Sequence, residues 1–178
     1  MTTAEVVKRI DSSLFRAGMR RLAGACTVIA SRGESGRAGL TATAVCSVSA
    51  EPARLLVCVN KSVFAHTVIV ESGRLSVNVL AAHQEGIARR FAGMVANVAG
   101  EDRFLGEGTW REGKFGIPIL EGTLVSFGCR VVEQIEAISH TVFTCEVVEV
   151  CCDEESTSPL VYFEGNFSQL EQEKIKNS

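Results

Sequence analysis

Small hydroxyl side chains alternate with apolar ones in residues 39–49, which read GLTATAVCSVS. Every second residue from 40 to 48 is apolar, and four hydroxyls stand at the odd-numbered positions: Thr41, Thr43, Ser47 and Ser49. This alternation is typical of a β-strand with one face in the core. The other face is either an ordinary solvated surface, because Thr is a good strand former, or a surface kept free of bulky side chains. In the second case a flat ligand with carbonyls, ring nitrogens and a phosphate can lie on it.

The motifs of several other chemistries are missing from the sequence. It has no Gly-x-Gly-x-x-Gly after a strand, no Gly-x-x-x-x-Gly-Lys-Ser/Thr and no Gly-x-Ser-x-Gly, the motifs of phosphate-binding loops and hydrolase nucleophiles. His66, His83 and His140 lie far apart, and Cys151 and Cys152 are adjacent, so the spacing of zinc ligands is missing as well. We therefore expect neither a metal site nor a hydrolase.

Composition and charge exclude further classes of partner. The chain has 178 residues, which favours one domain over residues 1–178. Its net charge is −3, and its 18 basic and 21 acidic residues are mixed along the chain, whereas a nucleic-acid partner needs a concentrated basic face. We find no apolar run long enough to span a membrane and no signal-peptide core. We therefore expect a cytoplasmic protein with no membrane or nucleic-acid partner.

Seven cysteines are present, an odd number, and a cytoplasmic location would keep them reduced. We expect those in strand-like runs to be buried and to act as small hydrophobic residues. They are Cys26, Cys46, Cys58, Cys129 and Cys145.

The order of the predicted elements favours a mainly β fold. Helices are predicted over residues 4–21, with a break near Asp11 and Ser12, and over 66–71 and 84–92. Strands are predicted over 26–30, 40–49, 55–60, 75–80, 125–131, 143–147 and 160–163, with a polar loop over 153–159. Because many strands follow one another after short turns, we expect an antiparallel barrel with a few helices around it rather than a parallel doubly wound sheet.

Longer stretches of the sequence resemble a known family. They are GLTATAVCSVSAEP, LLVCVN and LSVNVLAAHQEGIARRFAG, followed by Asp102–Phe104, Trp110, Pro118–Gly122, Ser139–Thr141 and Leu160–Phe163. In this order they are similar to the flavin reductase family of the FMN-binding split barrel, and especially to small reductase components of two-component monooxygenases of the 4-hydroxyphenylacetate 3-monooxygenase type. The resemblance covers roughly residues 15–170.

The resemblance implies a Greek-key split β-barrel with a few flanking helices, usually a homodimer. Such proteins use NADH to reduce FAD or FMN that is bound non-covalently and exchanges. The reduced flavin then leaves for a separate oxygenase component that acts on an aromatic substrate. In similar proteins the strand that matches residues 41–49 lines the flavin, which implies contacts from Thr41, Ala42, Thr43, Cys46, Ser47, Val48 and Ser49.

Two further segments match positions that bind the flavin tail. Family members usually show Asn-x-x-Ser with another hydroxyl shortly after it, whereas this chain has Val63 and Ala65 at those positions. The resemblance therefore assigns the phosphate to the remaining polar residues and a covering role to a phenylalanine: Asn60, Lys61, Ser62, Phe64 and His66. Arg89 and Phe91 match positions that reach toward the tail, although Phe91 can instead pack in the core with Ile87.

His140 is the candidate catalytic residue that the resemblance implies. Similar reductases carry Gly-Asp/Thr-His near the nicotinamide, and this chain has Ile138-Ser139-His140. Because hydride transfer needs no acid or base at the donor carbon, we expect His140 to position the carboxamide or to help protonate the reduced flavin. A structural histidine before a strand is the other interpretation.

Two other functions stay open at this point. One is a flavin- or haem-binding split-barrel module without turnover. The other is a reductase that passes electrons through bound flavin to another acceptor, such as a corrinoid or a ferric complex.

Overall fold

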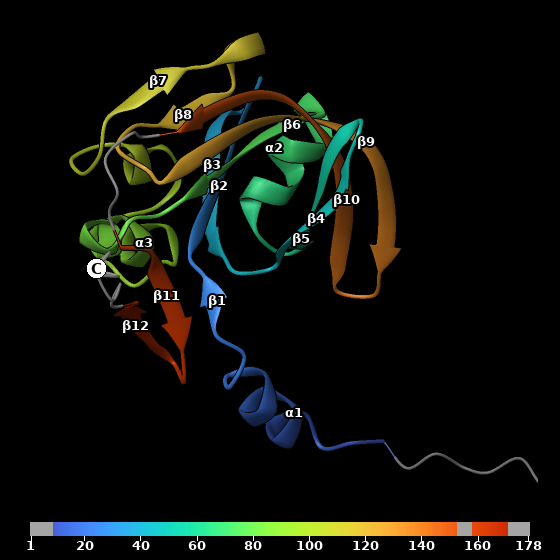
Figure 1. Cartoon of the computed structure of the whole chain (residues 1–178), viewed down its shortest axis with the longest axis vertical. Coiled ribbons are helices and arrows are strands. Elements are labelled where there is room, and N and C mark those ends of the chain that lie inside the picture. Colours follow the sequence, from blue (N-terminus) through green and yellow to red (C-terminus); the bar gives the residue numbers. More distant parts are fainter. Residues whose placement is uncertain (1–8, 153–157, 171–178) are drawn as a thin grey trace, which may run out of the picture.

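A seven-stranded antiparallel sheet, curled into an open barrel, is the centre of the computed structural model, which describes residues 9–152 and 158–170 (Figure 1). The strands follow one another across the sheet as β3 (Gly36–Ala42), β2 (Thr27–Gly33), β6 (Arg74–Val79), β9 (Val125–Ala137), β10 (His140–Cys152), β5 (Ala53–Asn60) and β4 (Val45–Ala50). The predicted mainly β fold with few helices is confirmed. Residues 1–8, 153–157 and 171–178, which include parts of the predicted first helix and polar loop, lie outside the described residues.

The two edge strands of this sheet are consecutive in the chain. β3 ends at Ala42 and β4 begins at Val45, so the prediction of one strand over residues 40–49 is wrong. The chain turns at residues 43–44, where the N–H of Val45 donates to the carbonyl of Thr43 at 3.0 Å. The carbonyl of Ala44 accepts from the N–H of Cys58 on β5 at 3.1 Å. Ala44 is therefore already bonded to β5, the strand that pairs with β4. This corner carries the chain from one edge of the barrel to the other.

Helix α2 (Phe64–Ser72) lies inside the curve of the barrel (Figure 1). Its Ala65 and Val68 pack with Ala38 of β3, and its Ile69 joins the main core beside Phe143 of β10. The helix ends at Gly73, which adopts φ 63°, a left-handed conformation that glycine tolerates best. This packing fixes the start of α2 next to the edge strand β3.

A second apolar cluster lies outside the barrel, beneath α3 (Glu85–Phe91). The rings of Phe91, Phe104 and Trp110 contact one another there, with centroids 4.8–5.5 Å apart. The elements around it are the short 3-10 segments η1 (Ala82–Gln84), η2 (Gly100–Phe104) and η3 (Lys114–Gly116), the hairpin β7 (Trp110–Glu112) and β8 (Pro118–Leu120), and the small sheet β1 (Gly24–Ala25), β11 (Leu160–Phe163) and β12 (Asn166–Gln169). Together these elements close one side of the barrel.

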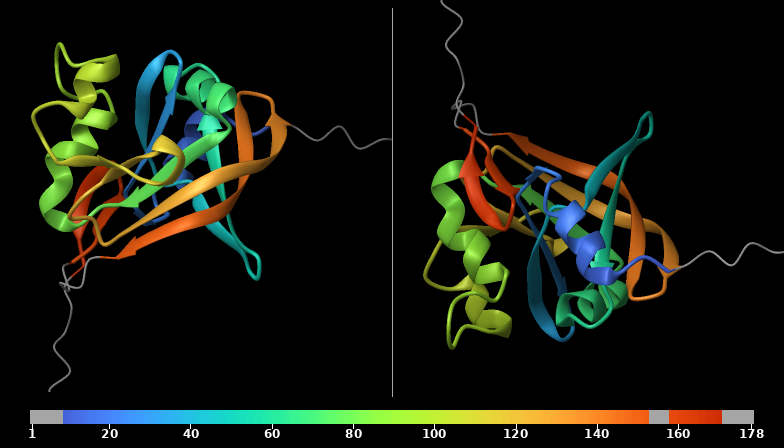
Figure 2. Two further views of the ribbon diagram at one scale, coloured as in Figure 1. Left: turned by 90° about the horizontal axis from the view of Figure 1, so that it is seen from above. Right: turned by 90° about the horizontal axis from the view of Figure 1, so that it is seen from below.

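Helix α1 (Ser12–Met19) stands away from the barrel in Figure 1, and in the view from below in Figure 2 it lies in front of the barrel. It begins at Ser12, at the break predicted near Asp11 and Ser12, because Asp11 caps it: the Asp11 carboxylate accepts from the N–H of Ser13 at 2.6 Å. A residue that caps a helix in this way has an extended backbone, so the helix starts at the residue after it. None of the residues of α1 is buried.

Of the five cysteines predicted to be buried, Cys26, Cys129 and Cys145 are buried in the core and Cys58 is half-buried, whereas Cys46 on β4 is exposed, contrary to expectation. Burial raises the pKa of the Cys26 thiol to about 11 and that of Cys145 to about 12, from an ordinary 9.0. The folded state thus keeps its thiol protons in a pH range where the unfolded chain has lost them. The free energy of unfolding should therefore fall as the pH rises from about 9 to about 11.

We expect a loss of about 1 kcal/mol for each buried thiol between about pH 9 and about pH 10, measured by urea unfolding. Cys145→Ala should flatten part of this pH dependence, whereas Cys46→Ala, at an exposed position, should leave it as in the wild type. The same slope in Cys145→Ala and the wild type would contradict the assignment.

Within residues 9–152 and 158–170, no helix is long and apolar enough to cross a membrane. The same residues hold no group of three or more His, Cys, Asp or Glu side chains arranged to bind a metal.

Candidate functional site

The β3–β4 corner borders a cavity of about 210 Å³. Thr41, Ala42 and Thr43 form one wall, and the others come from distant parts of the chain: Cys26, Ala92, Met94, Tyr162 and Phe167. No acceptor among the described residues is hydrogen-bonded to the N–H of Thr43 or of Ala44. A largely apolar cavity with free backbone donors at its edge suits a flat ring that carries carbonyl and ring-nitrogen acceptors. We call it the corner cavity.

The hydroxyl of Thr41 has a structural partner. It donates to the carbonyl of Ala88 in α3 at 2.6 Å, and Thr27 binds the carbonyl of Ala42 in the same way at 2.7 Å. These two hydrogen bonds attach the end of β3 to α3 and to β2. Thr41 therefore shapes the corner cavity, while Thr43, which is exposed, keeps its hydroxyl available.

Four predicted flavin contacts lie on β4, at the opposite edge of the sheet. Cys46, Ser47, Val48 and Ser49 are all exposed there, and none of them lines the corner cavity. The Ser49 hydroxyl donates to the carbonyl of Pro52 at 2.6 Å. The break at residues 43–44 explains this separation, because β3 and β4 belong to different edges. Within one chain the structure does not bring the two halves of the hydroxyl pattern together.

A second cavity, of about 280 Å³, lies along β3 next to the start of α2. We call it the tail cavity. It is lined by Ala38, Gly39, Val63, Phe64, Ala65, Ala99, Gly100 and Arg103. Val63 is the N-cap residue of α2 and has no polar side chain to cap the first turn. The N–H groups at the start of the helix and the Arg103 guanidinium therefore make this cavity suitable for an anion.

Arg103 is a residue of this cavity to which the sequence analysis gave no role. Its Nη1 donates to the carbonyls of Gly39 and Phe91, both at 3.2 Å. Its Nε is buried and has no hydrogen-bond partner among the described residues. The segments that contain Gly39 and Phe91 can approach each other this closely because residue 39 is a glycine: an added Cβ would lie 2.7 Å from the Phe91 ring. The only sequence signal was its place in the matching segment Asp102–Phe104.

The predicted phosphate ligands before α2 have other partners. The Asn60 side chain accepts from both the N–H and the hydroxyl of Ser62 at 2.9 Å, which forms a tight turn. The Lys61 ammonium donates a hydrogen bond to Glu136 on β9 and lowers the pKa of that carboxyl. His66 Nε2 lies 2.9 Å from the Thr141 hydroxyl on β10. Lys61 and His66 thus bind the β9–β10 hairpin, and neither lines the tail cavity.

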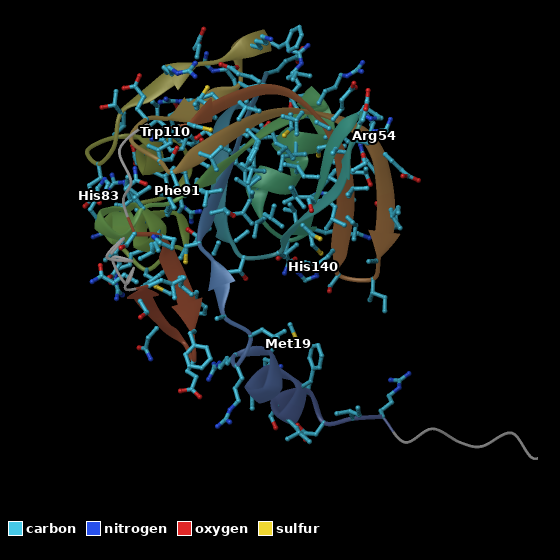
Figure 3. The ribbon with its side chains drawn as sticks, viewed as in Figure 1. Met19, Arg54, His83, Phe91, Trp110 and His140 are labelled. Atoms are coloured by element: carbon cyan, nitrogen blue, oxygen red, sulfur yellow. The ribbon has the colours of Figure 1, made fainter. Side chains whose placement is uncertain are left out.

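His140 opens β10, opposite Asn60 of β5 (Figure 3). Its Nδ1 lies 2.9 Å from the Ser139 hydroxyl, and the residue is half-buried. Because Cys58 of β5 binds the corner at Ala44, the strand register places His140 at the same end of the barrel as the corner. It does not line the corner cavity of its own chain.

The two predicted residues of α3 differ in accessibility. Arg89 is exposed, pairs with Glu85 at 2.7 Å, and lies over the ring of Phe167, 5.0 Å from its centroid; Phe167 lines the corner cavity, and Arg89 does not. Phe91 is 1% exposed and packs in the aromatic cluster. A ring so fully enclosed offers no face to a ligand, so Phe91 belongs to the core, contrary to the predicted flavin contact.

The fold is a split barrel with an apolar cavity at its corner, and the second cavity beside it contains a guanidinium. The family model of the flavin reductase like domain matches residues 19–171. The chain therefore belongs to the flavin reductase family of oxidoreductases, and the predicted resemblance is confirmed.

Curated relatives and a solved structure agree with this assignment. The chain is 40% identical over 169 residues to the FMN reductase (NADH) RutF of Stutzerimonas stutzeri, covering 95% of this chain and 94% of the relative. It is 42% identical over 157 residues to the 4-hydroxyphenylacetate 3-monooxygenase reductase component of Pseudomonas aeruginosa, covering 88% and 91%. The NADH:FAD oxidoreductase SgcE6 of Streptomyces globisporus superposes with a TM-score of 0.82 at 28% identity, covering 96% of this chain and all of that one.

Proposed function

We propose that this protein uses NADH to reduce FMN or FAD, which it binds non-covalently and releases. The observation that carries the proposal is the position of two cavities on one edge strand, β3. The first is lined by Thr43, which, like the adjacent Ala44, has an N–H without a partner among the described residues, and the second contains Arg103. A flavin mononucleotide has a flat ring with acceptors at one end and a phosphate at the other. The printed names of the relatives, an FMN reductase (NADH) and a monooxygenase reductase component, support the same cofactors.

The residues of this chain fit such a ligand and assist its chemistry in three ways. Flavin, when bound, supplies a ring that accepts a hydride from the reduced nicotinamide. The N–H groups of Thr43 and Ala44 would donate to the ring and stabilise the negative charge that it gains. Met94, Tyr162 and Phe167 would exclude water from its faces, and Arg103 would hold the phosphate.

The affinity that these groups can provide is compatible with release. Neutral hydrogen bonds contribute roughly 1 kcal/mol each, and one to a charged group about 1.5–3 kcal/mol. Together with ring burial, and after the cost of association, they reach the range of a micromolar site, about −8 kcal/mol. A reductase that delivers reduced flavin to another protein needs such a site.

We infer that the reduced flavin serves a separate oxygenase component, and that its substrate is aromatic. Support comes from the relative that is named as the reductase component of 4-hydroxyphenylacetate 3-monooxygenase. A cytoplasmic location is part of the proposal, and the seven unpaired cysteines suit it.

We further propose that two copies form a homodimer. Leu14, Phe15 and Leu22 are 61–68% exposed on and after α1, which no part of the described chain covers. Apolar side chains grouped on an unpartnered helix usually mark an interface, and a second copy would also bring new residues to the exposed strand β4 and to His140. Sedimentation of the purified protein tests this, and a monomer at micromolar concentration would contradict it.

The direct test of function is the consumption of NADH by the purified apoprotein with added FMN or FAD. Flavin-dependent loss of NADH absorbance, with free reduced flavin as product, is the expected result. A tightly retained flavin without NADH oxidation would instead favour a binding module. Reduction that becomes fast only with a corrinoid or ferric acceptor would favour the other alternative.

We predict that His140→Ala weakens the use of NADH more than it weakens flavin binding. Loss of one hydrogen bond to the nicotinamide, about 1 kcal/mol, corresponds to a fall of about fivefold in kcat/KM for NADH. Steady-state kinetics and flavin fluorescence titration measure the two effects. His83→Ala is the matched control, because His83 is exposed on η1 and lines neither cavity. Equal loss of NADH use and flavin affinity, or no loss of either, would count against the role of His140.

A further inference from the structure

Phe64 is an exposed aromatic residue at the edge of the tail cavity. It is the first residue of α2, and 51% of its surface is exposed. It takes part in none of the aromatic pairs or cation–π contacts found in the described residues. The exposed ring of Phe115, by contrast, has the Arg74 guanidinium 5.4 Å from its centroid. Phe64 thus offers a free ring face beside a cavity.

The other walls of the cavity explain what kind of group would use that face. Ala38, Gly39, Ala99 and Gly100 are small and leave about 280 Å³ open, near the lower limit of ordinary ligand pockets. Arg103 contributes a guanidinium that is fixed by two backbone carbonyls. An aromatic platform, a small-walled space and a fixed guanidinium are the features that bind a nucleobase attached to a phosphate.

Resting on the proposed function, we propose that the tail cavity holds the adenylate half of FAD, with the adenine stacked on Phe64 and the diphosphate at Arg103. FMN has no adenine and gains nothing from Phe64. The protein therefore prefers FAD to FMN, and Phe64 determines this preference. The corner cavity lies further along the same strand, at Thr41 and Ala42, and takes the ring of either flavin.

The test is the ratio of FAD to FMN affinity in Phe64→Ala, measured by fluorescence titration and by the KM of each flavin at fixed NADH. Because Phe64→Ala removes the ring on which the adenine stacks, we expect the ratio to fall by about tenfold, which corresponds to about 1.4 kcal/mol. Phe64→Tyr should restore the preference, whereas Phe64→Leu, which keeps an apolar side chain without an aromatic face, should not. Phe115→Ala, at an exposed phenylalanine outside both cavities, is the matched control.

The remaining outcomes separate this proposal from its alternatives. Equal changes for both flavins, or none, would overturn it. So would a rise in the KM for NADH alone, since that result would assign the ring to the adenine of the nicotinamide nucleotide. Failure of the wild type to reduce either flavin would defeat the proposed function itself, whereas normal reduction with an unchanged ratio in Phe64→Ala would defeat only the adenine site.

Discussion

Alanine in place of Asn78 should lower the free energy of unfolding by about 3–5 kcal/mol, the largest effect on stability that we predict. Asn78 lies on β6 and is fully buried. Its Nδ2 donates to the carbonyl of Val28 and to the Ser76 hydroxyl, both at 2.9 Å. Its Oδ1 accepts from the N–H of Leu120 at 3.0 Å and from the Ser126 hydroxyl at 2.8 Å. One side chain thus links β2, β6, β8 and β9.

The size of the effect follows from the partners that would be left. Removing the amide leaves up to four buried polar groups without it, and an unsatisfied buried group costs roughly 1–3 kcal/mol. Urea unfolding measures the change. Gln134→Ala is the control, because Gln134 carries an exposed side chain on β9, and it should change the stability by less than about 0.5 kcal/mol. A loss below about 1 kcal/mol in Asn78→Ala would show that water replaces the amide.

The strand containing Asn78 shows how far the sequence predicts the fold. The apolar residues Leu75, Val77 and Val79 alternate along 75–79, and the predicted strand there is confirmed as β6. The alternation of apolar residues, however, predicts only the local strand and not what covers its two faces. Ser76 and Asn78 are buried as well, because residues 118–120 cover the second face of β6, as the hydrogen bond from Leu120 shows. This cover comes from a distant segment that the pattern of β6 does not contain.

The candidate site was predictable to a similar degree. The hydroxyl pattern pointed to Thr41–Thr43, which do line a cavity, but the alternating apolar residues continued through the corner at residues 43–44, and only Val45 interrupted the hydroxyls. The sequence there has no glycine or proline to mark a turn. Arg103 was missed because its role depends on the carbonyls of Gly39 and Phe91. Neither contact is visible in the residues next to Arg103.

We expect Arg103→Gln to weaken FMN binding by about 10- to 100-fold while riboflavin, which has no phosphate, binds nearly as to the wild type. A hydrogen bond to a charged group contributes about 1.5–3 kcal/mol, and about 1.4 kcal/mol corresponds to tenfold in affinity. The guanidinium is well placed for this role because it lines the tail cavity next to the start of α2. Fluorescence titration with FMN and with riboflavin measures the difference.

A matched control separates the charge from the structural role of Arg103. Arg90 binds the backbone of the same segment, donating to the carbonyls of Arg103 at 3.1 Å and Asp102 at 2.7 Å, but it does not line the tail cavity. Arg90→Gln should therefore leave the ratio of FMN to riboflavin affinity unchanged. Arg103→Lys, which keeps the charge, should recover part of the FMN affinity. Since screening weakens ion pairs, added salt should weaken FMN binding to the wild type more than to Arg103→Gln. Equal weakening of FMN and riboflavin in Arg103→Gln would mean that Arg103 only supports the fold of β3.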